Sequence, residues 1–154
     1  MFLDSDAQYM DLALAEARKA EQAQEVPVGA IIVLNEAILG SGFNQPISTN
    51  DPTAHAEIVA LRKAAETVRN YRLPGATMYC TVEPCMMCAG AIIHARIARL
   101  VFGTPDPKAG AAGSIYNVLT DPRLNHRVNV VSGIQENQCA ALLREFFAGR
   151  RSGT

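Results

Sequence analysis

The sequence predicts an α/β fold in which a five-stranded mixed sheet carries helices on both faces. Two observations predict it. Strand-like and helix-like runs alternate along most of the 154 residues. Strand, helix and strand also follow one another within 76–103, and such a βαβ unit implies a parallel pair of strands joined by a right-handed crossover. A chain of this length is expected to form a single domain, 1–154, with a short flexible tail from about residue 150.

The first half is expected to supply two helices and two strands. Residues 5–24 combine a Ser or Asp start with apolar residues at helical spacing, which indicates a surface helix. Two β-rich runs lie within 26–44, and Asn35-Glu36 between them indicates a hairpin. QPISTNDPT (45–53) reads as a loop. Because Asp51-Pro52-Thr53 offers a cap and an early proline, a helix is expected from about His55 to about Asn70.

The second half is expected to supply three strands and two helices. Strands at 76–82 and 99–103 flank a short, nearly all-apolar helix at 85–95. The Pro- and Gly-rich stretch 104–114 is a long loop, and loops of that length inside a compact domain are often functional. The remaining expected elements are a strand in RVNVVSG (127–133) and a helix from about Glu136 to about Arg150 that buries Cys139, Leu142, Leu143 and Phe146.

Composition narrows the class of protein. The formal net charge is −1, so any contact with RNA or DNA would have to rest on a local basic patch. The start, MFLDSDAQYM, lacks a signal pattern, and no apolar run approaches the 18 residues of a membrane span. Four cysteines without a secretion signal favour a reducing compartment, and the cytoplasm is expected.

Two cysteines in the stretch TVEPCMMCAGAI are the first chemical signal. Cys85 and Cys88 share one face at the start of a predicted helix, where unpaired N–H groups and the helix dipole favour thiolates. Three interpretations are open for this pair: two cysteines that merely pack together, a redox pair, or two ligands of a zinc ion. Two ligands alone cannot complete a zinc site.

TAHAEIVAL (53–61) offers the missing ligand. His55 lies at the start of another predicted helix, and Pro84-Cys85-x-x-Cys88 follows after 28 intervening residues. One His and two Cys give three protein ligands and leave the fourth position of a tetrahedral zinc for water.

Glu57 favours a catalytic zinc over a structural one. A structural site would need a fourth Cys or His, and none has suitable spacing: Cys80, Cys139, His94 and His126 lie elsewhere. A carboxylate two residues after His55 can instead move protons beside the metal.

These residues carry a resemblance. His55-x-Glu57 with Pro84-Cys85-x-x-Cys88 is the signature of the zinc nucleobase deaminases. Beyond it, the chain resembles the bacterial tRNA-specific adenosine deaminases in EVPVGAIIV, DPTAHAEIVALR, NYRLPGATMYCTVEPCMMCAGAIIHARI, VFGTPDPKAGAAGS, LNHRV and CAALLREFF.

The resemblance implies a three-layer α/β/α cytidine-deaminase-like fold, a homodimer, and conversion of adenosine to inosine at the wobble position of an arginine tRNA. His55, Cys85 and Cys88 would bind one zinc ion per chain. Glu57 would be the general acid/base, taking a proton from water and delivering protons to adenine N1 and to the departing amine, which leaves as ammonia.

The resemblance also implies contacts to the substrate. Asn44 and the backbone of Ala56 would hold the flipped base, with Val28 packing on its face. Asp106 would accept a hydrogen bond from a ribose 2′-OH, because a carboxylate repels phosphate. The other implied substrate-binding residues are Pro84, Lys108, Phe146, Phe147, Arg150 and Arg151.

Two other functions stay open at this point. The same zinc chemistry could deaminate a free base or nucleoside such as guanine or cytosine, and the net charge of −1 does not separate that function from RNA editing. A catalytically silent zinc or redox module is the third possibility, and Glu57 argues against it.

Overall fold

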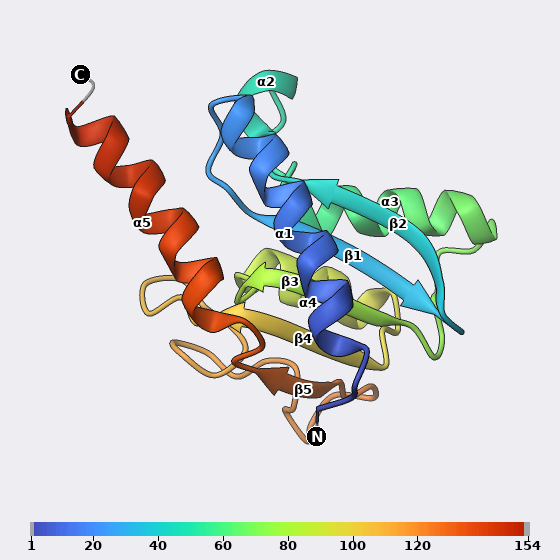
Figure 1. Cartoon of the computed structure of the whole chain (residues 1–154). Helices are drawn as coiled ribbons and strands as arrows, with labels where there is room; N and C mark the ends of the chain where they lie inside the picture. The colour runs from blue at the N-terminus through green and yellow to red at the C-terminus, as the bar shows by residue number, and fades with distance from the viewer. Residues whose placement is uncertain (1, 153–154) are drawn as a thin grey trace.

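The computed structural model describes residues 2–150 in full and the backbone of residues 151 and 152. Figure 1 shows its helices and strands. In chain order they are α1 (Asp6–Gln22), β1 (Gly29–Leu34), β2 (Ala37–Phe43), α2 (Pro46–Thr49), α3 (Ala56–Val68), β3 (Thr77–Val82), α4 (Met86–His94), β4 (Arg99–Thr104), β5 (Asn129–Ser132) and α5 (Glu136–Ser152).

The sheet has five strands in the order β2-β1-β3-β4-β5, as predicted in number and in mixed direction. β1 pairs antiparallel with β2 and β3, whereas β3–β4 and β4–β5 are parallel. The hairpin between β1 and β2 turns at Asn35 and Glu36, whose φ angles of 49° and 65° are those of a tight turn that follows the twist of the strands. The β3–α4–β4 unit is the predicted crossover.

Side chains alternate between the two faces of the sheet. Ile32 and Met78 pack in the core under α3 and α4, while their strand neighbours Ile31 and Tyr79 pack in a second core on the face that carries α1. The ribbon shows α1 and α5 on one side of the strands and α3 and α4 on the other (Figure 1). The fold is therefore the three-layer α/β/α arrangement that the resemblance implied.

Two glycines let α3 lie directly on the backbone of β2. A Cβ atom at Gly42 would come within 2.6 Å of the carbonyl oxygen of Ala56, and one at Gly40 within 2.6 Å of the carbonyl oxygen of Ala60. Any larger side chain would push the helix away from the strand. The first turn of α3 is thereby fixed against the sheet.

The predicted loop at 45–53 contains a short helix, α2, which sequence reasoning missed. The carboxylate of Glu25 accepts hydrogen bonds from the N–H groups of Ile47 (3.3 Å) and Ser48 (2.7 Å) at the start of α2. Glu25 is 1% exposed. A buried carboxylate from a distant segment stabilises this turn, and no local pattern announced it.

The start of α3 also differs from expectation. Asp51 does not cap the helix, because its carboxylate accepts the N–H (2.9 Å) and O–H (2.7 Å) of Thr53. The N-cap position belongs to His55, whose backbone is extended with φ −70° and ψ 155°. His55 therefore stands at the boundary of the helix, with its ring free to face a neighbouring element.

Helix α5 is less buried than expected. Cys139 is 1% exposed, but Leu142, Leu143 and Phe146 are only half-buried, and Phe147 is 43% exposed. The expectation that all four apolar residues lie in the core is wrong for three of them. Figure 1 shows the reason: only the first turns of α5 lie over the strands, and the rest extends beyond the sheet.

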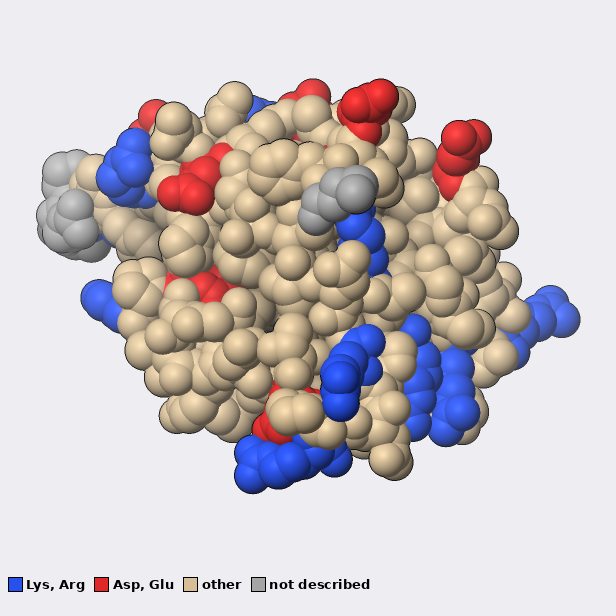
Figure 2. Space-filling view, turned by 90° about the horizontal axis from the view of Figure 1, so that it is seen from below, with Lys and Arg blue, Asp and Glu red and all other residues tan. Residues whose placement is uncertain are grey.

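Charge is unevenly distributed on the surface. In the face seen from below, most Lys and Arg side chains gather in the lower half and most Asp and Glu side chains in the upper half (Figure 2). The net charge of −1 is thus the sum of regions that are rich in basic and in acidic side chains. Among residues 2–152, none of the helices combines the length and the apolar character needed to cross a bilayer.

Candidate active site

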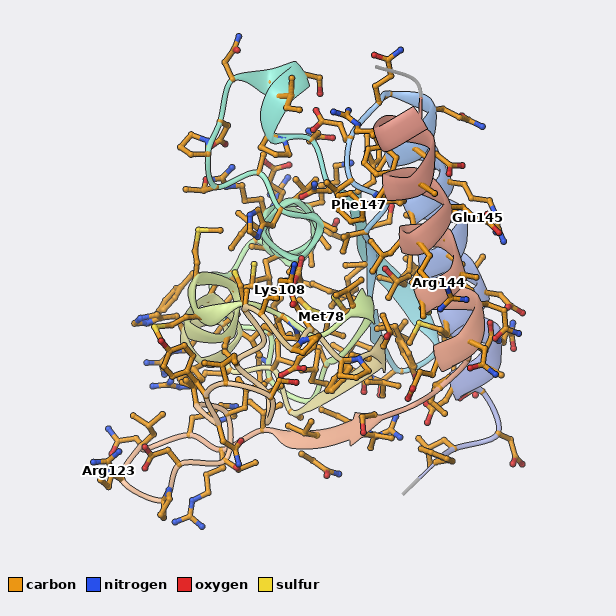
Figure 3. All side chains as sticks on the ribbon, turned by 90° about the vertical axis from the view of Figure 1, so that its left-hand side faces the viewer. Met78, Lys108, Arg123, Arg144, Glu145 and Phe147 are labelled. Carbon is orange, nitrogen blue, oxygen red and sulfur yellow. The ribbon has the colours of Figure 1, made fainter. Side chains whose placement is uncertain are left out.

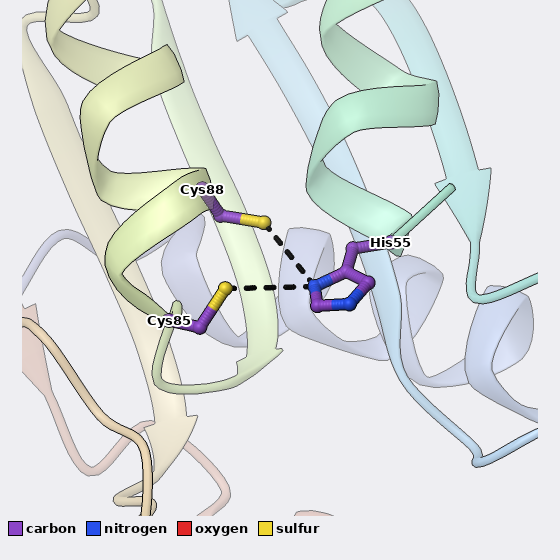
Figure 4. Close-up of side chains that lie close together, drawn as sticks. All are labelled: His55, Cys85 and Cys88. Carbon is purple, nitrogen blue, oxygen red and sulfur yellow. Dashed lines mark hydrogen bonds between the residues drawn. The ribbon is translucent and has the colours of Figure 1, made fainter. Parts of the chain in front are cut away.

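Three potential metal ligands converge from two helix starts. His55 occupies the N-cap position of α3, and Cys85 the N-cap position of α4, with Cys88 one turn further on. The Nδ1 atom of His55 lies 3.6 Å from Sγ of Cys85 and 3.5 Å from Sγ of Cys88 (Figure 4). The three donor atoms all lie within 4.8 Å of one another.

These separations fit a tetrahedral zinc ion. Bonds of about 2.3 Å to sulfur and about 2.05 Å to nitrogen, at the tetrahedral angle, place N and S about 3.6 Å apart. Both measured N–S distances agree with that value. One imidazole and two thiolates are also donors that zinc prefers over hard cations such as magnesium. The residues present therefore fit zinc.

The protonation of the three side chains is coupled. The hydrogen bond from Cys88 lowers the pKa of the Cys85 thiol to about 4, with a further contribution from His55, although burial acts in the opposite direction. The same hydrogen bond and burial raise the pKa of Cys88. The hydrogen bond with Cys85 raises the pKa of His55. The lowered pKa of Cys85 favours its thiolate form, which attracts a cation.

Glu57 lies in the first turn of α3 beside this cluster. Its side chain is only 4% exposed, and burial raises the pKa of its carboxyl group. A carboxyl group with a raised pKa accepts a proton more readily than an ordinary one, as a general acid/base requires. Glu57 is not among the three donors that surround the candidate metal position.

A pocket of 250 Å³ opens over these residues. This volume is smaller than the roughly 300–1,000 Å³ of sites for drug-sized ligands, so the pocket suits one small ring system. The structure brings Val28, Asn44 and Asp106, three substrate contacts that the resemblance implies, to its lining together with His55, Glu57 and Cys85. The remaining lining residues, which sequence reasoning missed, are Val26, Val82, Glu83 and Ala109.

Two other predicted residues, Ala56 and Pro84, are buried next to pocket-lining residues in the chain. Ala56 is fully buried as the first residue of α3, between His55 and Glu57. Pro84 is buried between Glu83 and Cys85, and its carbonyl oxygen accepts the N–H of Ala111 at 2.9 Å. Their chain neighbours His55, Glu57, Glu83 and Cys85 line the pocket.

Glu83 is buried at the end of β3 and binds the loop that follows β4. Its side chain accepts hydrogen bonds from the N–H groups of Asp106 (3.0 Å), Ala112 (2.9 Å) and Ser114 (3.1 Å), and from the hydroxyl of Ser114 (2.5 Å). Burial alone would raise the pKa of this carboxyl group, but the hydrogen bonds outweigh it and lower the pKa. The sequence signal that could have identified Glu83 as a site residue is its position directly before Pro84-Cys85.

Lys108 and Phe147 lie apart from the pocket, in a groove of 580 Å³ between the 104–114 loop and α5. Leu143, Arg144 and Ala148 complete its lining. Figure 3 labels Lys108, Arg144 and Phe147 along this side of the molecule. The groove therefore combines two cationic side chains with an exposed aromatic ring.

The other predicted residues of α5 make contacts within the chain. The ring of Phe146 lies edge-on to that of Phe147, with centroids 5.4 Å apart. The guanidinium of Arg150 lies 4.7 Å from the centroid of Phe146 and donates to the carbonyl oxygen of Gln24. The side chain of Arg151 is outside the part of the chain that the structure describes.

Comparison with known proteins agrees with this geometry. Residues 3–104 match the family model of the cytidine and deoxycytidylate deaminase zinc-binding region. The chain is 50% identical over 147 residues to the tRNA-specific adenosine deaminase of Haemophilus influenzae, covering 95% of this chain and 85% of that one. It is 42% identical over 145 residues to that of Bacillus subtilis, covering 94% and 90%.

Solved structures show the same relationship. A chain from a study of A-to-I editing by tRNA:A34 deaminases superposes with a TM-score of 0.85 at 46% identity, covering 88% of this chain and 99% of that chain. A guanine deaminase from Bacillus subtilis superposes with a TM-score of 0.63 at 37% identity, covering 70% and 69%. The chain belongs to the zinc-dependent cytidine and deoxycytidylate deaminase family, in the group of the tRNA-specific adenosine deaminases.

Proposed function

We propose that this protein hydrolytically deaminates adenosine to inosine at the wobble position of a tRNA, an arginine tRNA in the expectation from sequence, and releases ammonia. The observation that carries the proposal is a pocket for one base that combines the His55, Cys85 and Cys88 donors with the buried Glu57. The tRNA-specific relatives are 50% and 42% identical to the chain over more than nine tenths of its length, whereas the guanine deaminase from Bacillus subtilis is 37% identical over 70% and that from Nitrosomonas europaea is 23% identical over 96%.

The mechanism needs two functions, activation of water by the metal and transfer of protons by Glu57. Zinc, when bound by His55, Cys85 and Cys88, supplies a Lewis acid that makes water a nucleophile near neutral pH. Glu57 accepts a proton as water adds to C6 of adenine and delivers it to N1. It then accepts the proton of the new C6 hydroxyl and delivers it to the amine, which leaves as ammonia while C6 becomes a carbonyl. Because the side chain is almost fully buried, these transfers take place without competition from bulk solvent.

The walls of the pocket orient the base. Asn44 follows β2 and is held in place by the hydrogen bond from its N–H to the carbonyl oxygen of Val28, at 3.0 Å. In this proposal the Asn44 amide binds the ring edge, Val28 packs on the ring face, and the backbone of Ala56 binds the base from the start of α3. These contacts act on a base that has left its stack.

Recognition of RNA falls to the loop after β4 and to α5. In this proposal Asp106 accepts a hydrogen bond from a ribose 2′-OH at the rim of the pocket. Lys108 pairs with phosphate, and Phe147 stacks on an unpaired base. Phe146, Arg150 and Arg151 would support or extend this surface, Phe146 by its contact with Phe147.

The homodimer belongs to the same proposal. Met86 and Met87 on α4 are 48% and 37% exposed, and they give that helix an apolar outer surface beside a site residue, Cys85. We place the interface there and the enzyme in the cytoplasm, where tRNA is modified. Sedimentation of the wild type and of Met86→Glu tests the dimer: a dimeric Met86→Glu variant would contradict this interface.

Ammonia release tests the function. The zinc-loaded protein is supplied with an anticodon hairpin of an arginine tRNA that has adenosine at the wobble position, and separately with adenosine, guanine and cytosine. The proposal expects turnover of the hairpin and at least about a hundredfold lower kcat/KM for the free compounds, because the contacts outside the pocket are lost. Turnover of guanine or cytosine without turnover of the hairpin would establish the free-base alternative.

A further inference from the structure

The carboxylate of Glu83 is the meeting point of β3 and the loop after β4. Its oxygens accept four hydrogen bonds from three residues of that loop, two at Oε1, from the N–H of Asp106 and the hydroxyl of Ser114, and two at Oε2, from the N–H groups of Ala112 and Ser114. The side chain is 3% exposed. Every recorded partner is a donor, so the site is built for a carboxylate.

The loop is shaped around this side chain. A Cβ atom at Gly110 would lie 2.3 Å from Cδ of Glu83, so the carboxylate occupies the space that any other residue at 110 would need. The N–H of Glu83 also donates to the carbonyl oxygen of Thr104 at 2.9 Å. Glu83 at the end of β3 thus binds the loop at its start, through Thr104 and Asp106, and at its end, through Ala112 and Ser114.

The position of Asp106 depends on this attachment. Its N–H donates to Glu83, and its side-chain Oδ1 accepts the N–H groups of Lys108 (3.0 Å) and Ala109 (3.2 Å). Both recorded hydrogen bonds of the Asp106 carboxylate thus go to Oδ1. This turn holds Asp106 in the lining of the pocket that also contains Glu57.

We infer that Glu83 is a positioning residue for RNA: by holding the backbone of Asp106, it sets the preference of the enzyme for ribose over deoxyribose. The inference rests on the proposed function. It gives Glu83 a part in substrate selection that is separate from zinc binding, although it lies two residues before Cys85. Glu83 also lines the pocket, but both of its carboxylate oxygens accept hydrogen bonds from the loop, so in this inference it acts on the ribose through Asp106.

Glu83→Gln is the direct test. Whichever way the glutamine amide is turned, its NH₂ group faces at least one backbone N–H group, so the loop shifts while the size of the side chain is kept. The measurement is kcat/KM on an RNA hairpin and on the DNA hairpin of the same sequence, with zinc content determined in parallel. We expect the RNA-to-DNA ratio to fall about tenfold, mostly through a higher KM for RNA, at full zinc occupancy.

A double-mutant cycle separates positioning from a general structural effect. Asp106→Asn should lower the same ratio, and adding Glu83→Gln to it should lower the ratio little further, because both changes remove one interaction with ribose. Glu25→Gln is the matched control. Glu25 is also a buried carboxylate that accepts two backbone N–H groups, but it holds α2, so its replacement should leave the RNA-to-DNA ratio unchanged.

The outcomes are distinct. A wild type that does not turn over the RNA hairpin overturns the proposed function and this inference with it. An active wild type and an unchanged ratio in Glu83→Gln, or losses that simply add in the double variant, overturn the inference alone. Should Glu83→Gln not fold, Ser114→Ala removes one of the four hydrogen bonds and should lower the ratio about twofold to threefold; an unchanged ratio there also overturns it.

Discussion

The carboxylate of Asp6 and the guanidinium of Arg99 form a two-pronged ion pair, with one N–O distance of 2.8 Å at Oδ1 and one of 2.6 Å at Oδ2. Asp6 is fully buried at the start of α1, and Arg99 begins β4. The hydroxyl of Tyr79 donates to the same carboxylate at 2.7 Å, and the N–H of Leu3 at 2.8 Å. The first helix is thereby joined to the parallel part of the sheet.

This pair predicts an acid-sensitive contribution to stability. Burial alone would raise the pKa of Asp6, but the hydrogen bonds from Arg99, Leu3 and Tyr79 and the charge of Arg99 lower it from 3.8 to about 2. A carboxyl group whose pKa falls on folding stabilises the protein above its unfolded pKa, and this stabilisation is lost as the pH falls through the folded pKa. We expect a loss on the order of 2 kcal/mol between about pH 4 and about pH 2. Urea unfolding across that range measures it, and Asp6→Asn should flatten this part of the curve.

Removal of the Glu57 carboxylate should abolish turnover without removing zinc. Glu57→Ala deletes the group that moves the protons and leaves the three donors intact, so we expect kcat to fall by about 10³-fold or more. Zinc per chain is measured on the same sample as ammonia release. Loss of zinc from this variant would make Glu57 a ligand instead.

Two cysteine variants distinguish a metal ligand from a packed thiol. Cys88→Ser replaces a ligand, and we expect it to lose zinc and activity together. Cys139→Ala removes a buried thiol on α5 that packs on the opposite face of the sheet from α3 and α4, so zinc should stay bound while the free energy of unfolding falls by about 1 kcal/mol. Equal zinc content in both variants would contradict the assignment. Chelation of the wild type should abolish activity, and added zinc should restore it.

The contact of α3 with β2 gives a stability prediction. Gly42→Ala places a Cβ atom 2.6 Å from the carbonyl oxygen of Ala56, so we expect a loss of about 2 kcal/mol and weaker zinc binding as α3 shifts. Gly90→Ala on α4 is the matched control, because a Cβ atom there meets nothing within 4 Å. In a helix interior this change should stabilise by about 0.5–1 kcal/mol. Similar unfolding free energies for the two variants would contradict this packing.

The sequence predicted the sheet and the metal donors because both rest on local patterns. The β3–α4–β4 unit follows from alternating runs of strand and helix character, and the donors follow from helix starts at His55 and Cys85. Asn35 and Glu36 likewise identify their hairpin from two residues.

What the sequence did not predict depends on contacts between distant segments. Glu83 finds its partners 23 to 31 residues later, and Asp6 finds Arg99 93 residues later. Neither pairing has a periodic signal. The partial exposure of Leu142, Leu143 and Phe146 was missed for a related reason. Helical spacing shows which residues share a side of α5, but not how far the sheet extends beneath it.

The parallel pairing of β3 and β4 has a consequence for how such enzymes diversify. Cys85 follows one strand and Asp106 follows its neighbour, so the candidate metal ligand and the proposed ribose contact lie side by side on two stretches of chain that Glu83 joins. If the proposed contacts hold, exchange of the stretch after β4 for one that keeps its hydrogen bonds to Glu83 would change the substrate and leave the chemistry at Glu57 unchanged.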